Sequence, residues 1–227
     1  DKNIKKLNNK SLIDWAVHCA LGSKYIDKII LSTDYDLSQL SKLSSRFYHK
    51  RSKKLSGDNS LSYDVIKDIL KKFIKVNAYY DIVVLLEPPA PFRSSKLVDK
   101  CLELVYHNKA NSLVTLKKLE DYHPVRVKKF ISKNIINDFI IKEPKKGLPR
   151  QEQIDAYIRD TSVYIFESSN FLDGRDSLYG KKQLGYINKN KYSVNIDSEI
   201  EYLLAKLILK NKLANKNDMP KIWLNKI

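Results

Sequence analysis

Short apolar runs alternate with stretches of helical spacing along most of the chain. In the stretch before 112–116, for example, Val98, Cys101 and Val105 recur at the spacing of one helix face. Strand-like runs lie at 26–31, 82–86, 112–116, 162–166 and 192–197, and helix-like stretches lie at 11–21, 36–45, 62–75, 95–107 and 198–208. A continuous apolar run between helices is typical of a strand that is covered on both faces. The alternation therefore predicts one α/β domain with a mostly parallel sheet.

The stretch from about 120 to 160 breaks this alternation. It holds Pro124, Pro144, Gly147 and Pro149 between short β-like pieces such as 139–141. Irregular polar stretches of this length rarely build a core. We therefore expect an insertion here, either a lid or an arm that contacts a second subunit.

Unusual polar residues follow several of the apolar runs directly. They are Asp34, the segment from Glu87 to Arg93, and the pair Asn195 and Asp197. In open α/β sheets, ligands bind outside the carboxyl ends of the strands, so these side chains are expected to share one rim. Asp34 and Asp197 could instead cap the helices that follow them, although Ser198 offers a cap for the last helix. Three prolines between Glu87 and Arg93 predict a rigid turn that pre-organises Arg93 as a pocket wall.

The chain is strongly basic. It has 42 Lys and Arg against 26 Asp and Glu, which gives a formal charge of +16 in 227 residues. A basic surface attracts phosphates, so nucleotides, nucleic acids and anionic metabolites are all admissible partners. The lysines are spread in pairs beside helical stretches, however, and do not form one face with interleaved aromatic residues. We therefore expect solvated surfaces and no dedicated nucleic-acid site.

Cysteine and histidine spacing points to no metal centre. Cys19 and Cys101 lie among apolar neighbours and are predicted to be buried free thiols. The four histidines have neither metal-ligand spacing nor the arrangement of a Ser/His/Asp triad. No stretch has the ~18 to 20 uncharged apolar residues of a membrane-spanning helix, and the first residues lack the apolar core of a signal peptide, so we expect a cytoplasmic protein without a membrane partner.

Several short segments stand in a recurring order over almost the whole chain. They are 3–8 (NIKKLN) with 11–13, 31–34 (LSTD), Arg51 with 55–58 (LSGD), 85–93 (LLEPPAPFR), 123–124 (HP), 150–151 (RQ) and 193–199 (SVNIDSE). In this order and approximate spacing the chain resembles the acylneuraminate cytidylyltransferases, the CMP-sialic acid synthetases. Each fragment is weak by itself, and the ordered set carries the resemblance.

The resemblance implies a sugar-activating enzyme. In that family the anomeric hydroxyl of a nine-carbon ulosonic acid attacks the α-phosphorus of CTP, and a CMP-sugar and pyrophosphate form with the help of Mg²⁺. The implied fold is a Rossmann-like, three-layer nucleotidyltransferase domain over 1–227 with a small β-rich insertion. The implied assembly is a homodimer in which the region near 120–150 reaches the neighbour's sugar site. The family's first strand and nucleotide loop would lie just before Asp1.

The resemblance also assigns residues. Lys2, Asp197 and Arg150 are the implied catalytic residues, and Asp197 with Asn195 would hold the metal ion, since Mg²⁺ prefers oxygen ligands and usually takes one or two protein carboxylates. Nucleotide binding is implied for Asn3, Arg51, Asp58, Ser60 and Ser62, and sugar binding for Glu87, Arg93, Arg150, Arg159, Tyr164 and Tyr179. Arg150 is placed to pair with the sugar carboxylate through two hydrogen bonds.

Several residues depart from the family pattern, among them Pro89 and Ala90, which stand where a threonine and a serine are usual. Asn195 replaces the first metal-binding aspartate, Glu87 replaces a glutamine on the sugar side, and Thr161 stands where a glycine is usual. These departures keep a second hypothesis open, a catalytically impaired homologue that acts as a nucleotide-sugar-binding or regulatory subunit. A third hypothesis, a basic nucleic-acid-binding module, would be marked by affinity that falls steeply with salt.

Overall fold

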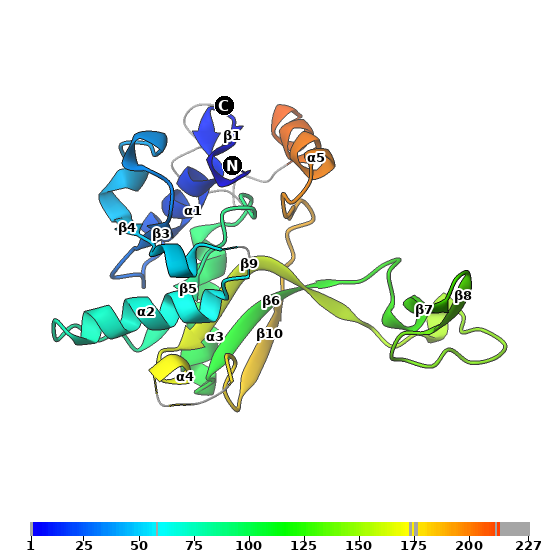
Figure 1. The fold of residues 1–227 in the computed structure, drawn as a ribbon. Coiled ribbons are helices and arrows are strands. Elements are labelled where there is room, and N and C mark those ends of the chain that lie inside the picture. Colours follow the sequence, from blue (N-terminus) through cyan, green and yellow to red (C-terminus); the bar gives the residue numbers. More distant parts are fainter. Residues whose placement is uncertain (1, 58, 173, 175–176, 212, 214–227) are drawn as a thin grey trace.

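The computed structural model describes residues 2–57, 59–172, 174, 177–211 and 213. Its main sheet has the strand order β10-β6-β9-β5, formed by Gln183–Ile187, Ser112–Lys118, Tyr157–Glu167 and Ile82–Leu85 (Figure 1). β10 runs parallel to β6, whereas β9 is antiparallel to both β6 and β5. The prediction of a mostly parallel sheet is therefore wrong. β6 and β9 pair directly, and the segment that joins them, residues 119–156, contains no α-helix that could cross over the sheet and make them parallel.

Helices cover both faces of this sheet. On one face α1 (Leu12–Leu21) and α3 (Ser95–Asn108) pack against Val163 and Ile165 of β9. On the other face α2 (Ser62–Ile74) and the short α4 (Ser169–Leu172) pack against Tyr164 and Phe166. Successive β9 side chains thus point to opposite helical layers, as the two-residue period of a strand requires. The three-layer α/β arrangement follows from this double burial.

A third cluster joins the two ends of the described chain. Trp15 of α1 contacts Phe92 edge to face, and its indole Nε1 donates to the Leu7 carbonyl at 3.1 Å. Val194, Ile196 and residues of α5 (Glu199–Lys210) complete the cluster. The hairpin of β1 (Lys6–Leu7) and β2 (Lys10–Ser11) leads into α1, where Ser11 and Asp14 form a capping box.

Three segments differ from their sequence-based assignment. The run at 26–31 forms a strand only from Leu31, where β3 (Leu31–Thr33) begins. β3 pairs in parallel with β4 (Tyr48–Lys50) and not with the main sheet. The stretch at 36–45 forms two short 3-10 helices, η2 (Leu37–Gln39) and η3 (Ser44–Phe47), instead of one α-helix. Residues 192–197 have no strand partner and run as an irregular connection. Further 3-10 turns lie at η1 (Lys2–Ile4), η4 (Lys53–Leu55), η5 (Pro124–Arg126) and η6 (Arg150–Glu152).

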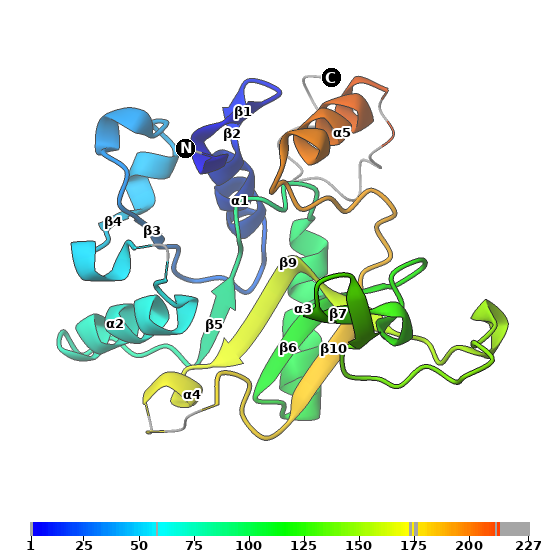
Figure 2. The same cartoon turned by 45° about the vertical axis from the view of Figure 1, so that its right-hand side comes forward.

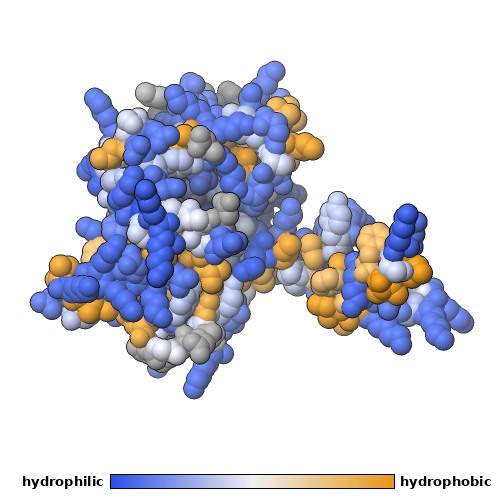
Figure 3. All heavy atoms as spheres, viewed as in Figure 1, coloured by the Kyte–Doolittle hydropathy of each residue, from blue (hydrophilic) through white to orange (hydrophobic). Residues whose placement is uncertain are grey.

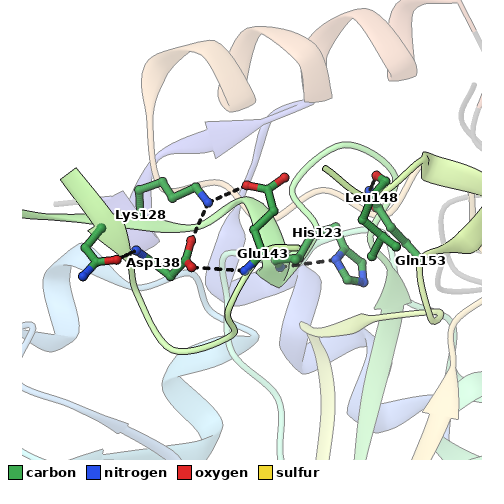
Figure 4. A network of polar contacts seen from close by, with 8 residues as sticks. His123, Lys128, Asp138, Glu143, Leu148 and Gln153 are labelled. Carbon is green, nitrogen blue, oxygen red and sulfur yellow. Dashed lines mark hydrogen bonds and ion pairs between the residues drawn. The ribbon is translucent and has the colours of Figure 1, made fainter. Parts of the chain in front are cut away.

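Residues 119–156, here called the arm, project away from the body of the molecule (Figures 1 and 2). Their hairpin consists of β7 (Lys128–Ser132) and β8 (Ile135–Asp138). Lys128 lies between the carboxylates of Asp138 and Glu143, with Nζ 2.6 Å from each, and Gln153 donates to the Leu148 carbonyl at 3.1 Å (Figure 4). His123 lies 2.8 Å from the Ile154 carbonyl oxygen. These contacts are internal to the arm, and the ion pair between Lys118 of β6 and Asp155 joins the arm to the body.

Both cysteines are buried and free, which confirms the thiol prediction. Burial raises the pKa of Cys19 to about 11 and that of Cys101 to about 12, so both stay protonated at neutral pH. Within the described ranges, no helix has both the length and the apolar character to cross a bilayer.

Candidate functional site

A cleft of about 1390 Å³ opens between α1, α2, β5 and the segment 26–35. Its wall is polar at one end and apolar at the other. The polar end holds eight of the residues singled out from the sequence, namely Lys2, Asn3, Arg51, Ser60, Ser62, Glu87, Asn195 and Asp197. They come from the beginning, the middle and the end of the chain, and only the fold brings them together. Asp58, which was predicted with them, falls outside the described residues.

Asp197 is the acidic centre of the polar end. Its Oδ1 atom accepts a hydrogen bond from Lys2 Nζ at 2.5 Å, and its Oδ2 atom accepts one from the Asn195 amide. Ser198 forms the capping box of α5 with Glu201, so Asp197 is not the cap of that helix. The Asp197 side chain is half exposed and therefore open to a ligand. The capping alternative for Asp197 is thus removed by the structure.

Asp34 is likewise free of a capping role. The helix that follows it, η2, is capped by Asp36, whose backbone N–H bonds to Gln39. Asp34 is exposed and lines the cleft. Tyr35, which sequence reasoning missed, lines it too, and burial raises the pKa of its hydroxyl. Its place two residues after the end of β3 is the signal that could have indicated it.

Arg51 and Asn3 form the side of the cleft that faces β3. The Arg51 guanidinium donates to the Ser32 carbonyl at 2.5 Å and to the Ser32 hydroxyl at 3.3 Å. These bonds fix the guanidinium beside the cleft. The side-chain oxygen of Asn3 is buried and has no hydrogen-bond partner among the described residues. A buried acceptor without a donor is costly, so this oxygen is prepared for a donor from a ligand.

Glu87 lies half-buried where the cleft meets β9. Burial is the main factor that raises the pKa of its carboxyl group. Arg93 opposes this shift, Asp197 adds to it, and the cations of Lys2 and Arg159 also oppose it. Glu87 therefore feels charges from both the acidic centre and the neighbouring strand.

Two predicted residues of β9, Arg159 and Tyr164, interact with Glu87 without lining the cleft. Arg159 donates to the Tyr179 hydroxyl at 2.6 Å. Tyr164 is buried, and burial together with Glu87 raises the pKa of its hydroxyl to about 12. Thr161, which does line the cleft, has a φ of 61°, an uncommon conformation for a β-branched residue.

Arg93 lies behind the cleft wall and does not form its surface. It is 1% exposed, and it donates to the carbonyl oxygens of Ser162 at 2.8 Å and Glu87 at 2.7 Å. These bonds fasten the proline-rich turn to β9. The arginine of the turn points into the protein and does not form the pocket wall that the sequence predicted, so any contact with a ligand passes through Glu87.

Arg150 is the predicted residue that the fold separates from the cleft. It begins η6 in the arm and pairs with Glu120 at 3.0 Å and Asp121 at 3.4 Å. The arm carries it away from the body, as Figure 1 shows. Within one copy of the described chain, Arg150 is therefore not part of the cleft.

The polar end has oxygen donors that suit a magnesium ion. Asp197 offers a carboxylate and Asn195 an amide oxygen, and Mg²⁺ commonly takes so few protein ligands when phosphates and water supply the rest. Across the part of the chain that the structure describes, no group of three or more His, Cys, Asp or Glu side chains could hold a metal ion by itself. The donor set thus fits a metal ion that arrives with an anionic ligand.

Comparison with known proteins adds to this geometry. A model of the Cytidylyltransferase family matches residues 1–172. The post-translational flagellin modification protein B of Campylobacter coli is 26% identical over 225 residues, which cover 96% of this chain and 92% of that protein. The CMP-N,N'-diacetyllegionaminic acid synthase of Campylobacter jejuni is 26% identical over 223 residues, with the same coverage. The N-acylneuraminate cytidylyltransferase of Oncorhynchus mykiss is 26% identical over 205 residues, which cover 90% of this chain and 45% of that protein.

Solved structures show the same fold at low identity. CMP:2-keto-3-deoxy-manno-octonic acid synthetase complexed with CTP aligns with a TM-score of 0.60 at 12% identity, over 92% of each chain. A 4-diphosphocytidyl-2C-methyl-D-erythritol synthase aligns with a TM-score of 0.63 at 10% identity, over 92% of this chain and 94% of that one. These likenesses establish an α/β nucleotidyltransferase fold. Because the family model spans most of the sequence, the chain belongs to the Cytidylyltransferase family and is a nucleotidyltransferase.

Proposed function

We propose that the protein transfers CMP from CTP to the anomeric hydroxyl of a nine-carbon ulosonic acid of the sialic or legionaminic type, with release of pyrophosphate. The observation that carries this proposal is the meeting of Lys2, Asn195 and Asp197 with Asn3 and Arg51 in one cleft. Such a cleft offers a cation for phosphates, oxygen donors for a hard metal ion and hydrogen-bonding groups for a nucleoside. Two of the relatives are named for reactions of this type.

Phosphates would bind between Lys2 and Asp197. Asp197 and Asn195 would hold Mg²⁺. A bound Mg²⁺ ion would neutralise the negative charge that develops on the phosphate oxygens. Lys2, which pairs with Asp197 in the structure, would place its ammonium group beside the phosphates. The ion pair seen in the structure thus keeps Lys2 close to the place where it acts.

The nucleoside would lie toward β3 and the start of α2. The unpartnered Asn3 oxygen can accept a hydrogen bond from a ribose hydroxyl. Arg51, held by Ser32, presents a fixed cation beside the base. Ser60 and Ser62 line the same end of the cleft and add hydroxyl groups. Asp58 completes the base-recognition set in this proposal.

The sugar would lie next to Glu87, on the side of β9. Arg159, Tyr164 and Tyr179 contribute a cation and two phenol rings there, and Arg93 supports Glu87 from behind. Arg150 would pair with the sugar carboxylate from the arm of a second subunit, since its own cleft is out of reach. The proposed sugar site is therefore shared between two copies.

The exposed apolar surface of the arm supports a homodimer. Phe130 is 75% exposed, Ile140 83% and Ile154 86%. Figure 3 shows hydrophobic residues gathered on the projecting arm. Large exposed apolar patches mark interaction surfaces, and in this proposal a second copy covers the patch.

The proposal is tested by measuring pyrophosphate release with CTP, Mg²⁺ and a panel of nine-carbon ulosonic acids. We expect release with at least one sialic- or legionaminic-type acid and none with CTP alone. Isothermal titration with CTP and Mg²⁺ provides the matching binding measurement. The absence of CTP binding would contradict the proposal for every sugar at once.

One observation favours the second candidate, an impaired homologue that binds a nucleotide sugar. The Asn195 amide donates a hydrogen bond to the Asp197 carboxylate. An aspartate at position 195 would repel that carboxylate, so with Asn195 the acidic centre carries one negative charge in place of two. In an active transferase, Asn195→Asp is expected to strengthen the dependence on Mg²⁺ and preserve turnover. Binding of CTP without any turnover, in both the parent and this variant, would favour the binding subunit.

A further inference from the structure

The candidate metal ligands lie on a segment that is not part of any strand. Residues 188–197, here called the connection, run as an irregular chain from the end of β10 to the start of α5. Two backbone N–H groups of the connection donate to carbonyl oxygens outside it, that of Asn188 to Leu116 at 2.8 Å and that of Ile196 to Pro89 at 2.9 Å. Its course therefore depends largely on hydrogen bonds made by side chains.

The carboxylate of Asp160 on β9 is the centre of these side-chain bonds. Asp160 is 8% exposed and does not line the cleft. Its Oδ1 atom accepts from the Ser162 N–H at 3.0 Å. Its Oδ2 atom accepts from the Asn188 amide at 2.5 Å and from the Ser193 hydroxyl at 3.5 Å. One carboxylate thus ties the connection to β9.

Asn188 transmits this contact along the connection. While its Nδ2 atom donates to Asp160, its Oδ1 atom accepts from the Asn190 N–H at 3.0 Å. The Asn190 amide donates to the Phe92 carbonyl at 2.8 Å and accepts from the Tyr192 N–H at 2.9 Å. The series of bonds that begins at Asp160 therefore reaches the proline-rich turn as well.

The same part of β9 also holds that turn directly. Arg93 donates to the carbonyl oxygens of Ser162 on β9 and Glu87 in the turn. Residues 160–162 are therefore the common support of two segments that carry site residues. They hold the turn through Arg93 and the connection through Asp160.

A buried carboxylate is a costly way to fill this place. The groups that donate to Asp160 are a backbone N–H, hydroxyls and an amide, all of them uncharged. Burial of a charge among neutral partners carries a desolvation penalty that an apolar side chain would avoid. An apolar side chain would, however, accept no hydrogen bond. What the carboxylate adds is a fixed direction for donors from both β9 and the connection.

We propose that Asp160 is a positioning residue of the cleft, which sets the place of Asn195 and Asp197 through its bond to Asn188. It acts through the connection and touches no ligand itself. The consequence for nucleotide binding rests on the proposed function, because Asn195 and Asp197 are the metal ligands in that proposal. The positioning of the connection does not rest on it.

The first test is hydrogen exchange in the variant Asn188→Asp, which places a second carboxylate against Asp160. The N–H groups of Ile196 and Asp197 are both hydrogen-bonded, so their exchange rates report on the order of the connection. We expect these rates to rise by about tenfold or more, while the rates in β6 stay at the parent level. Parent rates at 196 and 197 in this variant overturn the proposal.

Asn111→Asp is the matched control, since it makes the same substitution near the other end of β9. Asn111 donates to the Glu167 carboxylate at 2.6 Å, and it accepts from the N–H groups of Lys181 and Lys182. It thus also joins a carboxylate of β9 to a neighbouring loop, and it does not line the cleft. We expect parent exchange rates at 196 and 197 in this control.

Exchanging the two residues tests the bond itself. In the double variant Asp160→Asn with Asn188→Asp, the amide at 160 can donate to the carboxylate at 188, which can still accept from the Asn190 N–H. We expect exchange at 196 and 197 to return to within about threefold of the parent rate, because the coupling between two contacting residues is restored. Rates that stay as fast as in Asn188→Asp alone overturn the proposal.

Titration with CTP and Mg²⁺ tests the consequence for the site. We expect Asn188→Asp to weaken binding by about tenfold, as loss of a group that orients metal ligands typically does. The double variant should recover most of the affinity, and Asn111→Asp should keep it within about twofold. Parent affinity in Asn188→Asp overturns the role of Asp160 at the site. If the parent protein does not bind CTP, the proposed function fails, and the exchange rates still decide the positioning.

Discussion

At the scale of single residues, the site depends on charged side chains that neighbouring groups neutralise only in part. Asp197 receives one cation, Lys2, and one neutral donor, Asn195. The pair with Lys2 lies at the surface, where ion pairs contribute about 0–1 kcal/mol to stability. Its importance is therefore expected in ligand binding and turnover.

Substitution Asp197→Asn is expected to lower kcat for pyrophosphate release by about 10²–10³, the loss typical of removing one electrostatic contact to a transition state. The midpoint of urea unfolding should change little, because the side chain is half exposed. Glu199→Gln is the matched control. Glu199 pairs with Lys5 outside the cleft, so its loss should leave kcat within about twofold.

The raised pKa of Glu87 makes stability depend on pH. Since burial raises the folded-state pKa above the ordinary value of 4.5, the folded protein holds the Glu87 proton more tightly than the unfolded chain does. Its contribution is full below pH 4.5 and is lost as the pH rises through the folded-state pKa. Glu87→Gln should therefore match the parent at acid pH and become more stable than the parent toward neutral pH. Thermal unfolding of both proteins as a function of pH measures the difference between their stabilities. A difference that stays constant with pH would contradict this prediction.

Thr161 stores backbone strain that a glycine would release. At a φ of 61° a β-branched residue is disfavoured, and such conformations cost about 1–3 kcal/mol. Thr161→Gly is expected to stabilise the protein by about 1 kcal/mol, measured by urea unfolding. Thr161→Ala keeps a Cβ atom and loses the Thr161 hydroxyl bond to the Asp160 carbonyl, so it should give no such gain. Equal effects of the two variants would show that strain is not the cause.

At the scale of elements, strand ends and helix starts decide where the functional side chains lie. β9 is bulged opposite β6, where the register shifts between Val114 and Leu116. This shift turns Asp160 inward to bond with Ser162 and Asn188, while Arg159 stays outside and meets Tyr179. Bulges redirect neighbouring side chains in this way. The position of Arg159 beside Glu87 is a consequence of that bulge.

The start of α5 holds Asp197 in place through a cap. The Ser198 side chain accepts from the Glu201 N–H, and the Glu201 carboxylate accepts from the N–H groups of Asp197 and Ser198. Ser198→Ala is expected to destabilise the protein by about 1 kcal/mol. It should also raise the KM for CTP, because the Glu201 carboxylate that accepts from the Asp197 N–H loses its bond to the Ser198 hydroxyl. Ser45→Ala, at a partly exposed serine that caps no helix, is the control, and urea unfolding with steady-state kinetics provides both measurements.

At the scale of the whole molecule, the arm is the feature that a single copy leaves unexplained. It folds through its own ion pairs and exposes aromatic and aliphatic side chains to solvent. Arg150 within it is bound to Glu120 and Asp121 and stays away from the cleft. A second copy would satisfy both the apolar surface and the proposed role of Arg150.

The double substitution of Phe130→Ser with Ile140→Lys is expected to convert a dimer into a monomer in sedimentation velocity. Activity should fall with it if Arg150 acts in the neighbour's site, while the circular dichroism spectrum should stay the same. Lys129→Ser, an exposed polar change on β7, should leave the dimer intact. A parent protein that sediments as a monomer at micromolar concentration would refute the dimer.

The sequence by itself determined the alternation of helices and strands, because this depends on local patterns, whereas most of the candidate residues came from the family resemblance. Periodicity placed α1, α2, α3 and α5, since a helix face repeats every 3.6 residues, and strand ends pointed to Asp34, Glu87 and Asp197. The resemblance of ordered motifs indicated the Cytidylyltransferase family, which the family match confirms.

Only the tertiary structure decided the direction of β9, the burial of Arg93, the distance of Arg150 from the cleft and the open edge of β5. Strand direction depends on which segments pair, and pairing joins residues that lie far apart in the sequence. The proline-rich turn is compatible with an Arg93 side chain that points into the cleft or into the protein. Its hydrogen bonds to the carbonyl groups of Ser162 and Glu87 direct it into the protein. Long-range contacts of this kind leave no mark on local spacing, because a buried and an exposed arginine read alike in the chain.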